Sequence, residues 1–144
     1  MPAARYDIYT EQGTTFKLHL QYKFAGGTGI DLSAYTGELQ VRRSLKDAKA
    51  LLYLTSSGVT GGGVTGDFNV GVDGIAGIGG ISFNTGVNGA LGVSGGILLR
   101  VDKTTMSKIP NGKHFYDFEL TNSFNETIRL TEGVFEVSRE ITRI

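Results

Sequence analysis

Apolar and polar side chains alternate without a break in the stretch Phe16-Lys17-Leu18-His19-Leu20-Gln21-Tyr22-Lys23-Phe24. Successive side chains of a β-strand point to opposite faces, so this alternation predicts a strand with one face buried and the other in water. Turn-forming residues bound the stretch, with Gln12-Gly13 before it and Gly26-Gly27-Thr28-Gly29 after it. The chain is therefore expected to be built from β-strands.

Shorter segments elsewhere in the chain either alternate in the same way or form short apolar runs that are typical of a buried strand. Further strands are predicted at residues 5–11, 38–42, 50–55, 96–101, 114–121, 127–131 and 133–138. One or two helical turns are predicted between Asp102 and Ile109, and Pro110-Asn111-Gly112 closes that segment. A chain of about seven or eight short strands separated by turns favours two packed sheets. We therefore predict an all-β fold, an Ig-like antiparallel β-sandwich with one short helical turn.

One hydrophobic core is expected between the two sheets, because the apolar members of each alternating segment share a face. The predicted core residues are Phe16, Leu18, Leu20, Tyr22, Phe24, Leu39, Val41, Tyr116, Phe118, Leu120, Ile128, Leu130, Phe135 and Val137. Residues 1–144 are expected to form a single domain around this core.

A glycine-rich segment at about residues 57–96 interrupts the pattern. Fifteen of the 22 glycines lie between Gly58 and Gly96, and no Lys, Arg or His occurs from Ala50 to Leu99. A flexible linker would be polar, whereas this segment carries apolar side chains spaced through the glycines. Glycine loses much backbone freedom on ordering, so we expect the segment to order by packing against something.

We interpret this segment as an insertion that carries strands of its own or is clamped by a neighbouring subunit, since long structureless loops are uncommon inside a domain. Its apolar side chains are expected to form an interface with other chains. The predicted interface residues are Val64, Phe68, Val70, Val72, Ile75, Ile78, Ile81, Phe83, Val87, Leu91 and Val93.

The composition argues against several classes of function. The 14 Lys and Arg residues balance 14 Asp and Glu residues, so no overall charge draws the chain to nucleic acid or to an anionic membrane. The absence of cysteine excludes disulfides, thiolate metal sites and thiol nucleophiles. The sequence shows neither a signal-peptide core nor an apolar run long enough to span a bilayer. We expect a soluble, unprocessed protein that binds neither nucleic acid nor membrane.

Two glycine motifs resemble nucleotide-binding loops only in part. Gly61, Gly63 and Gly66 match GxGxxG, but the following residues are rich in glycine and β-branched side chains rather than helix formers. Asn111-Gly112-Lys113 lacks the first glycine and the Ser or Thr of a phosphate loop. Both motifs are interpreted as structural turns, and no cofactor is expected.

The titratable residues do not assemble into a catalytic or metal site. His114 falls on the apolar face of its strand, while Asp117 and Glu119 share the opposite face. We predict that this acidic face lies opposite Arg or Lys of a neighbouring strand. Asp67 and Asp73 lack the dense oxygen-ligand spacing of a calcium loop. No catalytic or metal-binding residue is predicted, and the chain is not expected to be an enzyme.

A series of short motifs follows one another along the chain. They are Tyr6-Asp7-Ile8 with Gln12-Gly13-Thr14-Thr15-Phe16, Ile30-Asp31-Leu32-Ser33-Ala34-Tyr35-Thr36 leading to Gln40-Val41-Arg42, Tyr116-Asp117-Phe118-Glu119-Leu120, Leu130-Thr131-Glu132-Gly133-Val134-Phe135-Glu136-Val137, and Ile141-Thr142-Arg143. In this order they resemble small β-sandwich virion proteins of tailed bacteriophages, above all tail-fibre connector, collar and baseplate-associated proteins from phages of marine cyanobacteria. The resemblance covers about residues 5–56 and 97–143, and the insertion departs from it.

The resemblance implies a virion component that repeats around a symmetric ring or surface and offers a docking site. Its partners would be other virion proteins and copies of itself, with fibre proteins as further candidates. It would be assembled in the host cytoplasm and reside in the virion. The resemblance implies neither a cofactor nor a reaction.

Two classes of function stay open at this point. In the first, the chain is a structural part of the tail, baseplate or collar and serves as an assembly or fibre-attachment module. In the second, it is a receptor- or glycan-binding module at a fibre tip, where Tyr9, Tyr22, Tyr35 and Tyr53 would offer stacking platforms. A capsid-surface decoration protein is a further alternative. The aliphatic, nearly uncharged insertion favours packing against protein.

Overall fold

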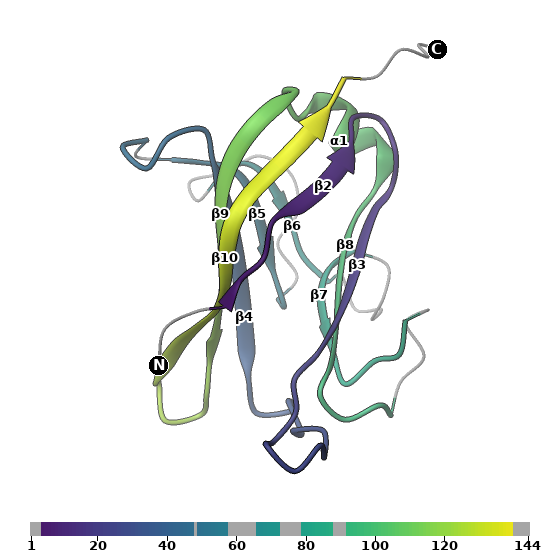
Figure 1. The fold of residues 1–144 in the computed structure, drawn as a ribbon, viewed down its shortest axis with the longest axis vertical. Coiled ribbons are helices and arrows are strands. Elements are labelled where there is room, and N and C mark those ends of the chain that lie inside the picture. Colours follow the sequence, from purple (N-terminus) through teal and green to yellow (C-terminus); the bar gives the residue numbers. More distant parts are fainter. Residues whose placement is uncertain (1–3, 48, 58–65, 73–78, 88–91, 140–144) are drawn as a thin grey trace.

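Two β-sheets packed face to face make up the described chain (Figure 1). The structure, a computed structural model, describes residues 4–47, 49–57, 66–72, 79–87 and 92–139. Within these residues the protein is mostly β, with one sheet of seven strands, one of three strands and a single short helix. The expected all-β class is confirmed.

The seven-stranded sheet is the larger layer. Its strands are β1 (Ala4–Arg5), β2 (Ile8–Glu11), β4 (Thr36–Arg42), β5 (Ala50–Thr55), β6 (Gly66–Val70), β9 (Gly112–Thr121) and β10 (Thr127–Ser138). In space they follow the order β1-β10-β9-β4-β5-β6, and β2 pairs with a later part of β10 than β1 does. The beginning and the end of the described chain therefore lie side by side at one edge of this sheet (Figure 1).

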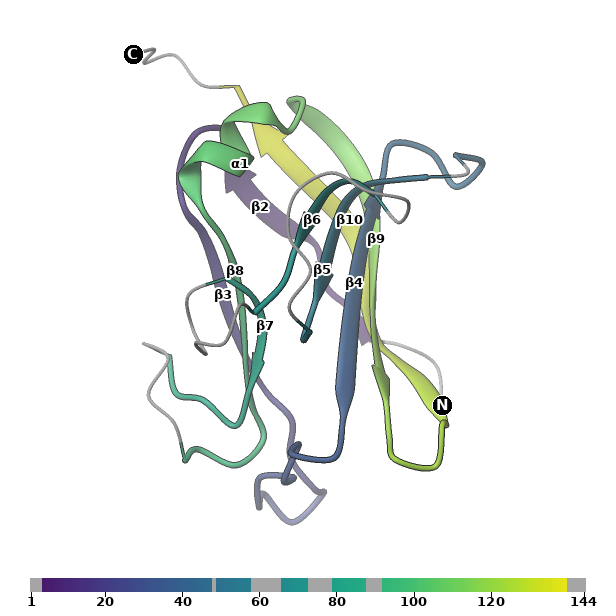
Figure 2. The ribbon, with the colours of Figure 1, turned by 180° about the vertical axis from the view of Figure 1, so that it is seen from behind.

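The three-stranded sheet covers part of the larger one. It consists of β3 (Phe16–Gln21), β8 (Gly96–Val101) and β7 (Gly80–Phe83), in that order. Helix α1 (Lys103–Lys108) connects β8 to β9 at one end of the sandwich (Figure 2). The Asp102 carboxylate accepts a hydrogen bond from the Thr105 N–H at 3.4 Å, which satisfies one free donor of the first helical turn. The predicted helical turns are confirmed.

Three strand pairs are parallel, so the antiparallel part of the fold prediction is wrong. β10 pairs in parallel with both β1 and β2, and β5 pairs in parallel with β6. A strand presents the same alternating faces whichever way it runs, so the side-chain pattern carries no information on direction. The sheets are therefore mixed.

Most of the predicted core residues lie between the sheets. The buried ones are Phe16, Leu39, Val41, Tyr116, Phe118, Leu120, Phe135 and Val137. Leu18, Leu20, Tyr22 and Leu130 are half-buried and pack against the same cluster. Period-two alternation therefore identified the inner faces of β3, β4, β9 and β10 correctly.

The core prediction is wrong for Phe24 and Ile128, which are 60% and 41% exposed. Phe24 lies beyond the end of β3, in a turn where its N–H donates to the Thr28 carbonyl at 2.8 Å. Ile128 lies near the tip of the β9–β10 hairpin, next to a bulge between Arg129 and Thr131. In both places the alternation of the sequence continues beyond the region in which the two sheets cover each other. The side chain is therefore exposed although it keeps the alternating pattern.

Residues outside the strands close the core at its ends. Met106 of α1, Ile109 after the helix, and Leu32 in the connection between β3 and β4 are each fully buried. These side chains stand in a short helix and in irregular segments, where the sequence is too short to show a period that would distinguish buried from exposed residues.

The glycine-rich segment contributes strands to both sheets. β6 extends the larger sheet beside β5, and β7 pairs with β8 in the smaller sheet. The prediction that the segment carries strands of its own is confirmed for this part. Because β6 and β7 complete the two layers, the described part of the segment belongs to the sandwich itself.

The side chains predicted to form an interface occupy different environments. Ile81 is 1% exposed and packs in the chain's own core, so its apolar character is explained within one chain. Phe68, Val70 and Phe83 pack partly against the same core, and Val72 is half-buried. Val87 and Val93 are 64% and 40% exposed. Val64, Ile75, Ile78 and Leu91 lie outside the described residues. The interface itself stays a prediction.

Candidate interaction site

His114 is a buried structural residue at the start of β9. It is 5% exposed, and its Nε2 lies 2.8 Å from the Pro110 carbonyl oxygen. Asp117 and Glu119 lie on the outer face of the same strand, as predicted from the alternation of side chains along it. The ring and the two carboxylates therefore point to opposite sides of the sheet and form no common site.

Arg129 of β10 lies opposite the two carboxylates on the outer face. Its guanidinium is 3.4 Å from Asp117, 3.9 Å from Glu119 and 3.8 Å from Glu132. The predicted basic neighbour of the acidic strand face is thus confirmed. Burial raises the pKa of the Glu119 carboxyl above its usual value, the Asp117 carboxylate raises this pKa further, and Arg129 lowers it.

The raised pKa of Glu119 leads to a prediction about stability. A carboxyl that holds its proton more tightly when folded stabilises the protein below its unfolded pKa, and this contribution is lost as pH rises through the folded pKa. We expect Glu119→Gln to raise the urea midpoint slightly at pH 7, and we expect the difference to disappear at pH 4.

Asp117→Asn is the comparison variant, because it removes the carboxylate nearest to Arg129 on the same strand face. We expect this variant to lower the midpoint slightly at pH 7. Equal losses of stability in both variants at pH 7 would contradict the assignment of an unfavourable charge to Glu119.

The other sequence candidates also occupy structural positions. His19 Nε2 lies 2.8 Å from the Thr85 carbonyl oxygen, and Asp67 forms an ion pair with Lys49 at 3.6 Å. Gly66 is part of β6, while Gly61, Gly63 and Asp73 lie outside the described residues. In the part of the chain that the structure describes, no group of three or more His, Asp or Glu side chains is placed to hold a metal ion. Nor does any helix there have the length and apolar composition to span a bilayer.

The four tyrosines considered as stacking platforms do not form one surface. Tyr22 and Tyr35 are half-buried and pack against the core, as their sequence positions also allowed. Tyr53 of β5 is half-buried, and burial raises its pKa. Tyr9 of β2 is 71% exposed. Of the four, Tyr9 alone presents a largely free ring, and it lines a groove beside β2.

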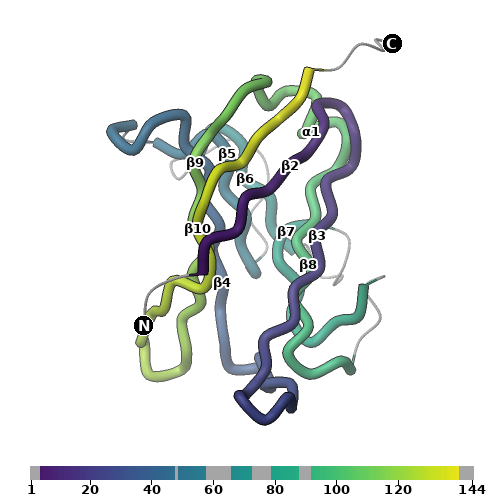
Figure 3. Tube along the Cα trace, viewed as in Figure 1, coloured from purple at the N-terminus to yellow at the C-terminus, as the bar shows by residue number. Residues whose placement is uncertain are grey.

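That groove lies where the chain crosses from the larger sheet to the smaller one. It has a volume of about 520 Å³ and is bounded by β2, β3 and the end of β10. Figure 3 traces the chain from β2 through the turn at residues 12–15 into β3. Gln12 anchors this turn, because its N–H donates to the Ser138 carbonyl and its side-chain amide to the Ile109 carbonyl, both at 2.9 Å. The two strands that flank the groove are therefore held in place.

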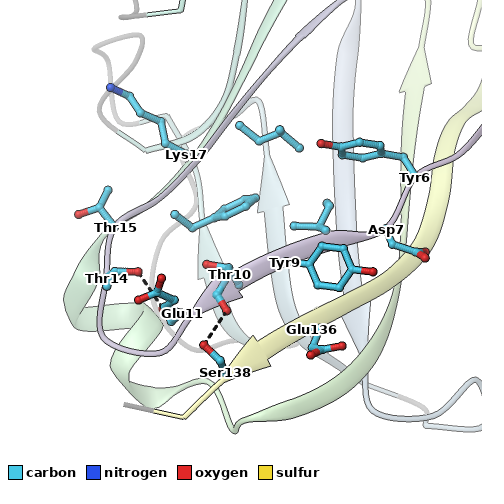
Figure 4. Close-up of a pocket in the computed structure, with 13 residues that line it drawn as sticks. Tyr6, Asp7, Tyr9, Thr10, Glu11, Thr14, Thr15, Lys17, Glu136 and Ser138 are labelled. Atoms are coloured by element: carbon cyan, nitrogen blue, oxygen red, sulfur yellow. Dashed lines mark hydrogen bonds between the residues drawn. The ribbon is translucent and has the colours of Figure 1, made fainter. Parts of the chain in front are cut away.

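The groove has an apolar floor and a polar rim. Ile8 and Phe16 form the floor and are 4% and 5% exposed, with Leu18 beside them. The Phe16 ring packs edge-on against the Phe135 ring, with centroids 5.4 Å apart. Figure 4 shows Glu11 and Glu136 on the side of β2 and β10, and Lys17 on the side of β3. The groove thus offers an apolar surface and charged groups of both signs.

Contacts between the two chain ends hold β2 at the groove. The Asp7 carboxylate accepts a hydrogen bond from the Val134 N–H at 3.0 Å, and the Tyr116 hydroxyl donates to the Tyr6 carbonyl. Gly133 faces this junction, where a Cβ would lie 2.6 Å from the Tyr6 carbonyl oxygen. The motif at residues 6–8 and the motif at residues 130–137 are therefore complementary in shape.

The groove was not predicted from the sequence. Its residues come from two edge strands of different sheets, and their pattern is that of ordinary half-buried strands. The signal that bears on it is the pair of motifs around Tyr6 and Gly133, which the fold brings together. Comparison of the sequence with models of known protein families and with curated proteins finds no match.

Proposed function

We propose that the chain is a non-enzymatic structural component of a tailed-phage virion, in the tail, baseplate or collar region, where it serves as an assembly or fibre-attachment module. The observation that carries the proposal is the position of the motifs on which the resemblance rests. Those at residues 40–42, 116–120 and 130–137 lie on β4, β9 and β10, which are neighbours in one sheet. The motif at residues 6–8 joins them at the edge of β10.

The strand order supports a finer assignment of the fold. If β2 to β10 are lettered A′, B, C, C′, C″, D, E, F and G, the larger sheet contains A′GFCC′C″ and the smaller one BED, as in variable-type Ig sandwiches. The helix between β8 and β9 corresponds to the E–F corner. The parallel pairing of β5 with β6 departs from that pattern. We infer an Ig-like sandwich with a modified C′–C″ region, a fold that by itself implies no particular function.

The environments of the titratable groups favour a non-enzymatic role. His19, His114, Asp67 and Asp117 each have a structural partner, and the groove places no histidine beside its carboxylates. Catalysis by acid and base needs such groups to converge on one reacting atom. A groove between two strand edges instead suits the attachment of another chain.

The proposal is tested by locating the chain in purified particles of the phage that encodes it. We expect quantitative mass spectrometry to find it in the virion at a copy number set by a symmetric ring. Immunogold labelling should then place it on the tail, the baseplate or the collar. A chain that is abundant in infected cells but absent from particles would refute the proposal, and labelling over the capsid would favour a decoration protein.

A further inference from the structure

The edge strand β3 of the three-stranded sheet has no second partner strand among the described residues. The order of that sheet is β3-β8-β7, so β3 is paired with β8 on one side only. Lys17 and Gln21 are exposed and His19 is half-buried. An unpaired edge presents a row of N–H and C=O groups that can accept another strand.

The backbone hydrogen bonds show which residues of β3 face the open side. The Tyr22 N–H donates to the Gly95 carbonyl at 2.7 Å, so residue 22 faces β8. Groups in an antiparallel pair alternate between facing the partner and facing away. Residues 16, 18 and 20 therefore also face β8, and Lys17, His19 and Gln21 direct their backbone groups to the open side. The position of Gly96, which lies opposite Gln21 in the register, supports this assignment. Its carbonyl accepts a hydrogen bond from the Thr85 N–H, so the backbone of Gly96 faces the β7 side and not Gln21.

The groove lies along the first half of this open edge. β2 forms its opposite wall, and Tyr9 and Glu11 of β2 are exposed there. A whole second domain pairing with β3 would have to approach past this wall. A single extended segment needs only the width of one strand, about 5 Å between neighbouring backbones. The shape of the site therefore favours a peptide segment over a folded copy of the chain.

The charges around the groove favour a basic segment. Asp7, Glu11 and Glu136 line it, against Lys17 on the facing strand. Asp7 is already paired with Arg5 at 3.3 Å. Glu11 and Glu136 form no ion pair with any of the residues that the structure describes. A bound strand would be stabilised by ion pairs between its Lys or Arg side chains and these carboxylates, and by apolar side chains that pack over Ile8 and Phe16.

We propose that β3 and the groove bind an extended segment of a partner protein, which adds to the smaller sheet as a fourth strand. Its alternate residues are apolar and cover the groove floor, and Lys or Arg residues between them face Glu11 and Glu136. Main-chain hydrogen bonds to Lys17, His19 and Gln21 supply affinity, and the groove supplies selectivity. The inference deepens the proposed attachment role by naming the chemistry of the attached segment.

The test uses a hexapeptide in which valine and lysine alternate, added to the full chain. We expect the amide protons of Lys17, His19 and Gln21 to exchange about tenfold more slowly when the peptide is bound, because they acquire partners. The amides of Leu18 and Leu20 already bond to β8 and should change little. A peptide of alternating valine and glutamate should bind more weakly than the lysine peptide. N-methylation of the alternate peptide nitrogens that face β3 should abolish binding.

A matched pair of variants tests the edge from the side of the protein. Lys17→Pro removes the outward N–H, whereas Lys17→Ala removes the same charge and keeps that donor. We expect Lys17→Pro to weaken peptide binding about tenfold relative to Lys17→Ala, since proline also blocks close approach of a strand. If Lys17→Pro does not fold, the N-methylated peptide tests the same hydrogen bonds on the unaltered chain.

Several results would overturn the inference. They are unchanged exchange at Lys17, His19 and Gln21, equal binding of the lysine and glutamate peptides, and protection confined to β6. Protection of the β3 edge that rises with protein concentration in the absence of peptide would show self-pairing instead. The proposed function fails separately, because a chain absent from virions could still bind the peptide, and a virion component could fail to bind it.

Discussion

Replacing Phe118 with alanine is expected to lower the free energy of unfolding by about 3–5 kcal/mol. The side chain is fully buried at the middle of β9, where Leu39 of β4 and Thr131 of β10 lie on either side of it. Its ring also lies close to Gly37, where an added Cβ would be 3.3 Å from Cε1. The substitution removes apolar contacts and leaves a cavity that strands held on both sides cannot close.

Urea unfolding followed by far-UV circular dichroism measures this loss, provided that the m value is unchanged. Phe115→Ala is the matched control, because it truncates the same residue type on the outer face of the same strand, where the ring is 44% exposed. We expect the control to cost under about 1 kcal/mol. Similar losses in the two variants would contradict the placement of Phe118 at the centre of the core.

Replacing Gly96 with alanine is expected to destabilise the protein by about 3 kcal/mol or more, since backbone must move to admit the new methyl group. A Cβ at this position would lie 1.7 Å from the Thr85 carbonyl oxygen. Gly96 begins β8, and its own carbonyl accepts from the Thr85 N–H at 3.4 Å. The substitution would thus force β8 away from the segment that follows β7.

The control for this prediction is Gly26→Ala, in the turn after β3. An added Cβ there meets no atom within 4 Å, so the unfolding midpoint should stay close to that of the parent chain. Thermal unfolding of both variants provides the comparison. A Gly96→Ala protein as stable as the Gly26→Ala protein would show that β8 and the Thr85 segment are not packed as described.

The strands with long alternation could be predicted from sequence, and the edges of the sheets could not. In β9, Tyr116, Phe118 and Leu120 face the core as their parity requires, and Asp117 and Glu119 face outward toward Arg129. The groove has no comparable signature. Ile8 and Phe16 look like ordinary inward residues of two strands, and the sequence does not state that those strands end up at neighbouring edges.

The glycine-rich segment shows how tertiary packing changes an interpretation. Its composition predicted an insertion whose apolar side chains, Ile81 among them, form an interface with other chains, yet Ile81 lies in the chain's own core. Several of its glycines stand where another backbone approaches, as at Gly80, where an added Cβ would lie 2.7 Å from the Thr55 carbonyl oxygen. Glycine here permits close backbone packing between β5 and β7, a use that composition does not distinguish from flexibility.

The sequence by itself determined the β class, the inward faces of the central strands and the short helix after β8. These follow from local physics, because alternation, turn residues and helix capping act between residues close in the chain. Only the tertiary structure decided three features: the direction in which β2 runs beside β10, the parallel pairing of β6 with β5, and the open edge of β3. Those depend on which distant segments meet, since a strand offers the same hydrogen-bonding groups along both edges until the rest of the fold covers one of them.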